Sequence, residues 1–157
     1  MSKLQLIEIS KLKNGTIYNI KENNQNIKFY LKNVTPMFKP DKFRNTYYIK
    51  WNVINSNLTN ISKIENVLEN YFIEKNIKRN IINKEGYPLM LNTKFIYSKQ
   101  NPIIINGSVS NIVEFITNNM KEEYDICLEM GKIFIDETSV KFPLNIKSLE
   151  FSKVKLV

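Results

Sequence analysis

Polar and apolar residues alternate over several short stretches in the first third of the chain. Residues 15–21 and 27–34 are rich in β-branched and aromatic residues and are separated by the turn-forming residues 22–26, which predicts a β-hairpin. Because the side chains of a strand point alternately to its two faces, the second stretch has one apolar and one polar face. The apolar face carries Ile27, Phe29 and Leu31, and the opposite face carries Lys28, Tyr30 and Lys32.

Residues 46–54 repeat this arrangement. Their alternation places Tyr47, Ile49, Trp51 and Val53 on one face and Tyr48, Lys50 and Asn52 on the other. We assign Trp51 to the core because both of its neighbours on that face, Ile49 and Val53, are apolar. Two predicted strands therefore each carry a face of tyrosine and lysine opposite an apolar face.

The spacing of apolar residues changes after residue 60. Recurrence every three or four residues predicts an amphipathic helix over residues 61–75, with Ser62 and Glu65 as a capping box at its start. The residues expected to face the core are Ile61, Ile64, Val67, Leu68, Tyr71 and Phe72. Strand character returns over residues 87–98, and a second, shorter helix is predicted over residues 109–120.

The final third of the chain alternates again. Residues 124–135 predict a strand with a bulge at Gly131, and a turn near residues 137–139 returns the chain along residues 142–157. The fold class is therefore mainly β with two helices (α+β), in one domain spanning residues 1–157. A strand meander, a helix and a closing hairpin follow the order of an OB-fold, a partly open antiparallel barrel whose second and third strands carry the ligand face.

Composition adds a charge pattern to this picture. Asparagine, isoleucine and lysine make up 67 of the 157 residues, the usage of an AT-rich genome, so part of the net charge of +8 reflects codon drift. The distribution is more informative, because residues 1–100 carry 17 basic and 7 acidic side chains and residues 101–157 carry 6 and 8. One part of the molecule is therefore expected to be electropositive, which favours a polyanionic partner.

Several kinds of chemistry lack the residues that they need. Without histidine the chain has no common general base, no Ser–His–Asp triad and no Cys/His zinc cluster. No glycine-rich phosphate loop occurs. Asp125, Glu129 and Asp136 lie close in sequence, so a Mg²⁺ site is the one metal alternative, although such acids are ordinary on an exposed strand face. We expect neither an enzyme nor a cofactor.

Flat rings and cations are interleaved most densely over residues 38–51. Rings stack on exposed bases and cations neutralise phosphates, so this mixture is typical of proteins that bind single-stranded nucleic acid. The two polar faces belong to the second and third strands of the predicted barrel if the count begins at residue 15. On them, Tyr30 and Tyr48 are expected to stack on bases and Lys28, Lys32 and Lys50 to meet phosphates. The loop of residues 35–45 is expected to close over them with Phe38, Lys39, Lys42, Phe43 and Arg44.

The stretch from residue 37 to residue 53, with the Ile-x-x-Ile-Glu start of the helix at residues 61–65, resembles OB-fold single-stranded DNA-binding proteins predicted in large AT-rich DNA viruses. The resemblance implies sequence-tolerant binding of single-stranded nucleic acid, with DNA favoured over RNA, in replication or repair. This sequence departs from the pattern of that family over residues 76–123, which are expected to hold an insertion. With Cys127 as the one cysteine and no long apolar run, we expect a reducing intracellular compartment, the host cytoplasm or nucleus for a viral protein, and no membrane contact.

The alternative is a non-catalytic structural or protein-interaction subunit, such as a component of a viral assembly. Exposed tyrosine and phenylalanine are also enriched at protein interfaces, so the same rings could face a protein partner or a second copy of the chain. Added salt distinguishes the two readings, because phosphate contacts weaken steeply with salt and a largely apolar interface does not.

Overall fold

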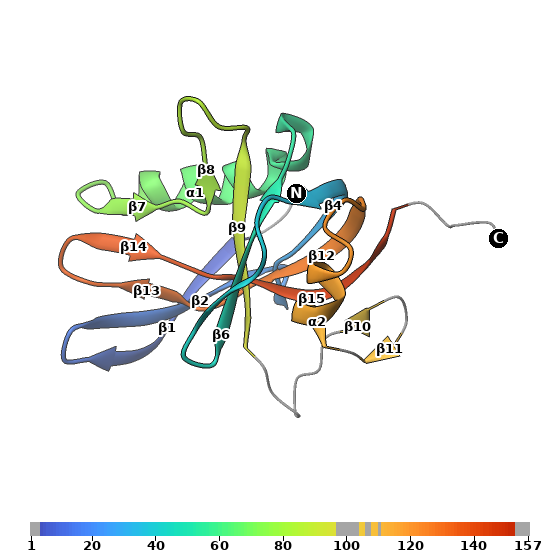
Figure 1. Cartoon of the computed structure of the whole chain (residues 1–157). Coiled ribbons are helices and arrows are strands. Elements are labelled where there is room, and N and C mark those ends of the chain that lie inside the picture. Colours follow the sequence, from blue (N-terminus) through green and yellow to red (C-terminus); the bar gives the residue numbers. More distant parts are fainter. Residues whose placement is uncertain (1–3, 97–103, 106–107, 110, 153–157) are drawn as a thin grey trace.

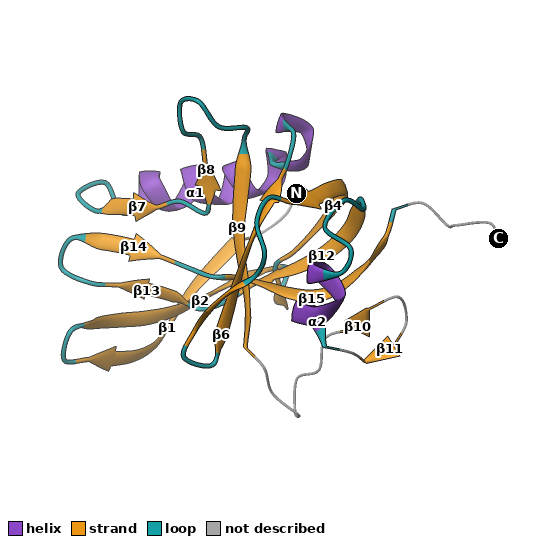
Figure 2. Ribbon diagram, in the orientation of Figure 1, coloured by secondary structure: helices purple, strands orange, loops and turns teal. Residues whose placement is uncertain are grey.

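The fold is described by a computed structural model that covers residues 4–96, 104–105, 108–109 and 111–152 (Figure 1). Strands dominate it and two helices accompany them (Figure 2), so the predicted α+β class with a mainly β content is confirmed. No helix within the described residues is long and apolar enough to cross a lipid bilayer.

Five strands close into a barrel. They are β4 (Lys28–Pro36), β6 (Thr46–Asn52), β9 (Met90–Ile96), β12 (Tyr124–Met130) and β15 (Leu144–Phe151). Neighbours follow the order β15, β12, β4, β6, β9, and a parallel pairing of Lys94 with Asn145 joins β9 back to β15. This closed, five-stranded arrangement agrees with the predicted OB-fold, although one of its pairings is parallel rather than antiparallel.

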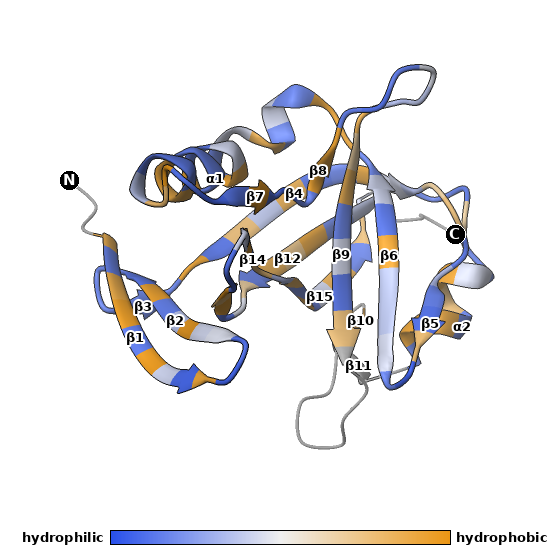
Figure 3. Cartoon of the chain, turned by 90° about the vertical axis from the view of Figure 1, so that its left-hand side faces the viewer, coloured by the Kyte–Doolittle hydropathy of each residue, from blue (hydrophilic) through white to orange (hydrophobic). Residues whose placement is uncertain are grey.

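A second sheet stands beside the barrel. Its strands are β1 (Leu4–Leu12), β2 (Gly15–Glu22), β3 (Gln25–Asn26), β13 (Ile133–Ile135), β14 (Ser139–Lys141) and β7 (Asn76–Lys78). β2 pairs with β1, β3 and β13 and not with β4, so the predicted hairpin of residues 15–21 with 27–34 is wrong. The alternation extends upstream into β1 (Figure 3), and this strand is the true partner of β2.

This correction changes the number of each barrel strand. The hairpin β1–β2 lies outside the barrel, so β4 is the first barrel strand, β6 the second and β9 the third. The tyrosine and lysine faces expected on strands two and three therefore lie on strands one and two. Residues 76–123, expected to hold an insertion, include β9, and the hairpin β13–β14 leaves the barrel between its fourth and fifth strands.

The strand faces themselves follow the predicted alternation. Phe29 and Leu31 are buried, whereas the side chain of Tyr30 is 73% exposed. At Asn33 the backbone adopts a positive φ of 59°, and its N–H donates to Oδ1 of Asp125 at 3.0 Å. The pairing of β4 with β12 shifts register at this point, so Val34 points into the core again.

Trp51 lies in the core, as predicted, with none of its surface exposed. Its Nε1–H donates to Oγ1 of Thr93 at 2.9 Å, and that hydroxyl donates to the carbonyl of Ile49 at 2.9 Å. Its ring meets the buried ring of Tyr124 edge to face at 5.7 Å. Burial raises the pKa of Tyr124 to about 12, with a smaller contribution from Glu122.

Helix α1 (Thr59–Tyr71) follows the 3-10 turn η1 (Asn55–Asn57) and lies beside β7 (Figure 1). The helix is confirmed, but it begins two residues earlier and ends four residues earlier than predicted. Val67 and Tyr71, expected in the core, are 40% and 68% exposed. The predicted capping box is wrong, because Glu65 lies in the middle of the helix with its side chain completely buried in the protein, and it does not cap the first turn.

Helix α2 (Ile112–Thr117) directly precedes β12 in the chain and is shorter than predicted. The side chain of Asn111 caps it by accepting from the N–H groups of Val113 and Glu114 at 3.0 and 3.3 Å. The remaining short strands are β5 (Asp41–Phe43), β8 (Ile81–Ile82), β10 (Ile104–Ile105) and β11 (Ser108–Val109). The ends of two predicted strands, at residues 97–98 and 153–157, lie outside the described residues.

The hairpin β13–β14 has a tightly bonded turn, close to the position predicted. Oδ1 of Asp136 accepts from the N–H groups of Thr138 and Ser139 at 2.9 and 2.7 Å, and these bonds lower its pKa. Nζ of Lys75, beyond the end of α1, donates to the carbonyl of Asp136 at 2.7 Å. The predicted bulge at Gly131 is wrong, because Gly131 lies in neither strand, between the end of β12 and the start of β13. The pairing of β12 with β15 shifts register between Cys127 and Leu128 instead.

Candidate nucleic-acid interface

A groove of about 1070 Å³ separates the outer face of two barrel strands from the hairpin β13–β14. β6 and β9 supply Tyr48, Asn92 and Lys94 on one side, and β13–β14 supplies Phe134 and Lys141 on the other. Lys78, Arg79 and Asn80 lie at the end of β7 and just beyond it and complete the lining there. The groove thus lies on the second and third strands of the barrel, where OB-folds hold oligonucleotides.

Glycine at position 131 lets the chain pass through the base of this groove. A Cβ there would lie 2.4 Å from Cγ of Pro143 and 2.9 Å from Nδ2 of Asn145, closer than atoms can approach. The N–H of Gly131 donates to the carbonyl of Pro143 at 2.9 Å. The two connections between the barrel and the hairpin β13–β14 are therefore packed directly against each other at this point.

The lining of the groove is strongly basic. Its cations are Lys21, Lys78, Arg79, Lys94, Lys132 and Lys141, and its one carboxylate is that of Glu129. Within the described part of the chain, Arg79 is the only one of these cations that forms an ion pair. Lysines gathered in a concave surface without acidic partners attract a polyanion.

Lys94 and Lys141 are two like charges that repel each other in the groove. Burial lowers the pKa of Lys94, and repulsion by the Lys141 ammonium lowers it further. Lys94 is held in place by its strand, because it pairs with Tyr48 of β6 on one side and with Asn145 of β15 on the other. A phosphate between the two ammonium groups would relieve their repulsion and favour the charged form of Lys94.

Two aromatic rings stand among these cations. Tyr48 extends from β6 next to Lys94, and Phe134 extends from β13 next to Lys141. Nζ of Lys141 lies 5.2 Å from the centre of the Phe134 ring. Rings that alternate with cations along a groove offer stacking surfaces for bases beside contacts for phosphates, as single-strand binding requires.

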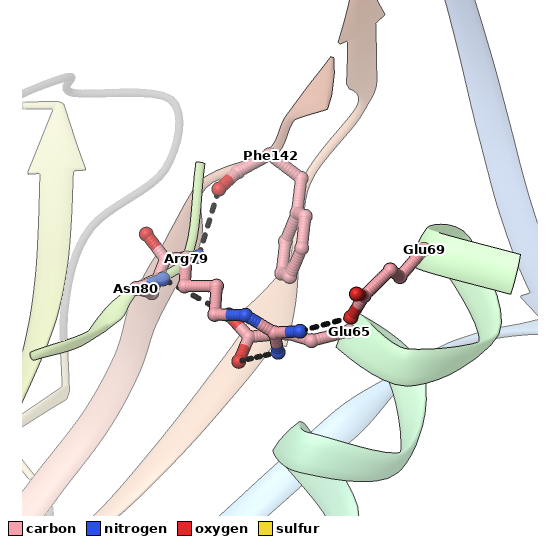
Figure 4. A network of polar contacts seen from close by, with 5 residues as sticks. All are labelled: Glu65, Glu69, Arg79, Asn80 and Phe142. Atoms are coloured by element: carbon pink, nitrogen blue, oxygen red, sulfur yellow. Dashed lines mark hydrogen bonds and ion pairs between the residues drawn. The ribbon is translucent and has the colours of Figure 1, made fainter. Parts of the chain in front are cut away.

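A buried polar network fixes the part of the groove next to α1 (Figure 4). Glu65 pairs with Arg79 at 3.4 Å and accepts from the N–H of Asn80 at 3.0 Å, and Arg79 also pairs with Glu69. Nδ2 of Asn80 donates to the carbonyl of Phe142 at 2.9 Å. Burial raises the pKa of Glu65, while these hydrogen bonds and the charge of Arg79 oppose that rise. The network ties α1 to Arg79 and Asn80 and, through Asn80, to Phe142, all three of which line the groove.

The residues predicted from the sequence fall into three groups. Tyr48 lines the groove, and Lys28 and Tyr30 line an adjoining pocket. Lys50 lies on the same outer face of β6 as Tyr48, and Lys32 precedes the bulge of β4, but neither lines these two cavities. The third group belongs to the connection from β4 to β6 and contains Phe38, Lys39, Lys42, Phe43 and Arg44.

This connection is a small hairpin at the start of β6. β5 pairs with residues 46–48, and Phe38 and Phe43 are 48% and 64% exposed. Lys42 lies 5.6 Å from the centre of the Tyr47 ring, and Arg44 lies 5.4 Å from that of Phe43. In an OB-fold, the connection between the first two strands borders the ligand face. None of these five residues lines the groove itself.

Sequence reasoning missed the residues that β9 and β13–β14 contribute. For Lys94 the information was present, because Asn92 and Lys94 alternate with the buried Leu91, Thr93 and Phe95. The wrong strand count led away from it. For Phe134 and Lys141 no sequence pattern was available, since the fold brings their hairpin to the groove.

The proposed metal alternative receives no support from the arrangement of its acids. Asp125 accepts from Asn33 and from Oγ of Ser152, Glu129 from Asn26, and Asp136 from its own turn. No group of three or more Cys, Asp or Glu residues gathers as a metal site within the described residues. Cys127 is half-buried, and its pKa is raised mainly by burial, with a smaller contribution from Glu129.

No protein-family model matches the chain, and no curated protein matches its sequence. The fold, in contrast, is similar to that of solved structures. The fold is similar to that of the single-stranded DNA-binding protein from bacteriophage Enc34, with a TM-score of 0.50 at 12% identity, covering 97% of this chain and 92% of that one. A C-terminal truncation of that protein also has a TM-score of 0.50, at 13% identity, with 97% and 95% covered. At such low identity the similarity concerns the fold.

Proposed function

We propose that this chain binds single-stranded DNA in the groove between β6, β9 and the hairpin β13–β14. The observation that carries the proposal is the combination of Lys78, Lys94, Lys132 and Lys141, unpaired within the described residues, with the rings of Tyr48 and Phe134. The similarity of fold to a phage protein that binds single-stranded DNA supports it. The role is binding without catalysis, in replication or repair.

The arrangement favours single strands over a duplex for a geometric reason. In a duplex the bases stack on one another and pair, so their faces are not available to protein rings, whereas a single strand can present each base to a ring. Contacts between lysine and phosphate carry no sequence information, so binding should tolerate any sequence along most of the groove. The hairpin formed by residues 38–45 extends this surface, with Lys32 and Lys50 as further phosphate contacts.

The proposal is tested by replacing Tyr48 with alanine and measuring the affinity for a labelled oligothymidine by fluorescence anisotropy. Loss of one stacked base corresponds to about 1–3 kcal/mol, so we expect an affinity at least about fivefold lower. Tyr71→Ala is the matched control, because Tyr71 is 68% exposed on α1 and does not line the groove. Equal affinities for the Tyr48 variant and the wild type would contradict the proposed surface.

Protein interaction is a second candidate function, favoured by a different surface. Val67, Tyr71 and Ile73 lie on or just after α1 and are 40%, 68% and 83% exposed. Exposed apolar side chains close together are typical of protein interfaces, with a partner or with a second copy. If this surface carries the function, Tyr71→Ala weakens association in a way that added salt does not reproduce, and Tyr48→Ala leaves it unchanged.

A further inference from the structure

A second pocket, of about 700 Å³, opens beside the groove at its β4 end. It is lined by the turn and strand ends of residues 21–26 together with Lys28, Tyr30 and Glu129. Lys21, Asn26 and Glu129 line both cavities, so the pocket and the groove adjoin at these residues. A strand lying in the groove could therefore direct one of its bases into the pocket.

The wall of the pocket on β4 offers a free ring face. Tyr30 is 73% exposed and takes part in none of the ring–ring contacts found among the described residues. Its backbone is held by the pairing of β4 with β12, in which Tyr30 lies directly across from Cys127. An exposed ring on a rigid strand is suited to stack on a base.

The boundary between the two cavities carries the carboxylate of Glu129, and the pocket is lined further by Lys21, Lys28 and a second carboxylate, that of Glu22. Nδ2 of Asn26 donates to Oε1 of Glu129 at 3.3 Å, and Nζ of Lys21 donates to Oδ1 of Asn26 at 2.6 Å. Glu129 pairs across the strands with Lys28, beside Tyr30 on the same face. An ionised carboxylate only accepts hydrogen bonds and repels phosphate, so its natural counterpart in a bound strand is a base that donates.

We propose that this pocket receives one base of the bound strand, which stacks on Tyr30 and donates hydrogen bonds to Glu129. This inference rests on the proposed binding of single-stranded DNA. Guanine fits best, because its ring N–H and amino group can donate side by side to the two carboxylate oxygens. Thymine fits worst, because its single N–H lies between two carbonyl oxygens that the carboxylate repels. Binding is then tolerant along the groove but selective at one position.

The test compares a thymidine strand of about 12 nucleotides with the same strand carrying one central guanine, a length within the roughly 4–16 nucleotides that an OB-fold covers. A bidentate contact to a base discriminates by about 1–3 kcal/mol, so the wild type should bind the guanine strand at least about fivefold more tightly. Glu129→Gln should bring the ratio close to one, because an amide both donates and accepts and therefore accommodates thymine.

Glu137→Gln is the matched control, because it removes the same charge at an exposed position of the β13–β14 turn that lines neither cavity. It should preserve the wild-type ratio while changing both affinities together. Thermal melting of each variant confirms that it is folded before binding is compared.

The outcomes separate the two proposals. If the wild type binds both strands equally, or if Glu129→Gln keeps the guanine preference, the base pocket is refuted and binding in the groove stands. If the wild type binds neither strand at low salt, the proposed function fails and the pocket fails with it.

Discussion

Replacing Lys94 and Lys141 by glutamine should make the salt dependence of single-strand binding less steep. The size of the change follows from the number of phosphate contacts that the groove offers. Four of its lysines, namely Lys78, Lys94, Lys132 and Lys141, make neither an ion pair nor a hydrogen bond within the described residues. Each phosphate contact to a single strand adds about −0.7 to the slope of log affinity against log salt, so these four lysines contribute about −2.8 of the total slope. Raising salt from about 50 to about 200 mM should then weaken wild-type binding roughly 50-fold through these four contacts alone.

The double variant loses two of these contacts, so its slope should be less steep by about 1.4, and the same change in salt should weaken its binding about sevenfold less than that of the wild type. The assay is fluorescence anisotropy with labelled oligothymidine over a series of potassium chloride concentrations. A matched control replaces Lys11 and Lys63, which are exposed on β1 and α1 outside the groove, and removes the same total charge. An unchanged slope in the groove variant, or an equal change in the control, would show that total charge rather than this groove governs binding.

Three further predictions follow from other contacts. Because burial and Lys141 lower the pKa of Lys94, wild-type DNA binding should weaken with rising pH before the ordinary lysine pKa of 10.5 is reached. Lys94→Arg should resist this loss, because arginine keeps its charge. Coincident pH profiles of the two proteins would count against a contact between Lys94 and DNA. Thr93→Val should lower the free energy of unfolding in urea by about 1–3 kcal/mol, because the buried Trp51 N–H loses its acceptor, and an unchanged urea midpoint would contradict this. Hydrogen bonds lower the pKa of Asp136 below its ordinary value of 3.8, so its carboxylate stabilises the fold above about pH 3.8 and loses this effect as the pH falls through the lowered pKa. Asp136→Asn should therefore flatten the acid side of a plot of Tm against pH.

The faces of individual strands could be predicted from the sequence because they depend only on local alternation. Phe29, Leu31, Ile49 and Trp51 are buried as expected, and Tyr30 is exposed. Which strands pair could not be predicted in the same way, because alternation states which side chains share a face and says nothing of the neighbouring strand. Residues 15–22 carried a correct strand pattern and were nevertheless assigned the wrong partner.

The candidate site shows the same division. Tyr48 could be identified from its own strand, whereas the groove around it joins residues from β2, β6, β9 and β13–β14 that lie far apart in the chain.

Glu65 illustrates a second limit of prediction from the sequence. Its spacing from Ser62 matched a helix cap, but a basic partner, Arg79, and a backbone donor, Asn80, gave its carboxylate better hydrogen bonds inside the protein. Tertiary contacts overrode a local pattern.

The parallel pairing that closes the barrel between β9 and β15 also bears on how the chain folds during synthesis. Some 50 positions separate Lys94 from Asn145, so the barrel cannot close until residues 144–151 have left the ribosome. Until then β12 and the part of β9 beyond its pairing with β8 present unpaired edges, which favour association between nascent chains. Because contacts so distant in sequence form slowly, the last barrel strand is expected to set the folding rate, and the growing chain to depend on protection by chaperones.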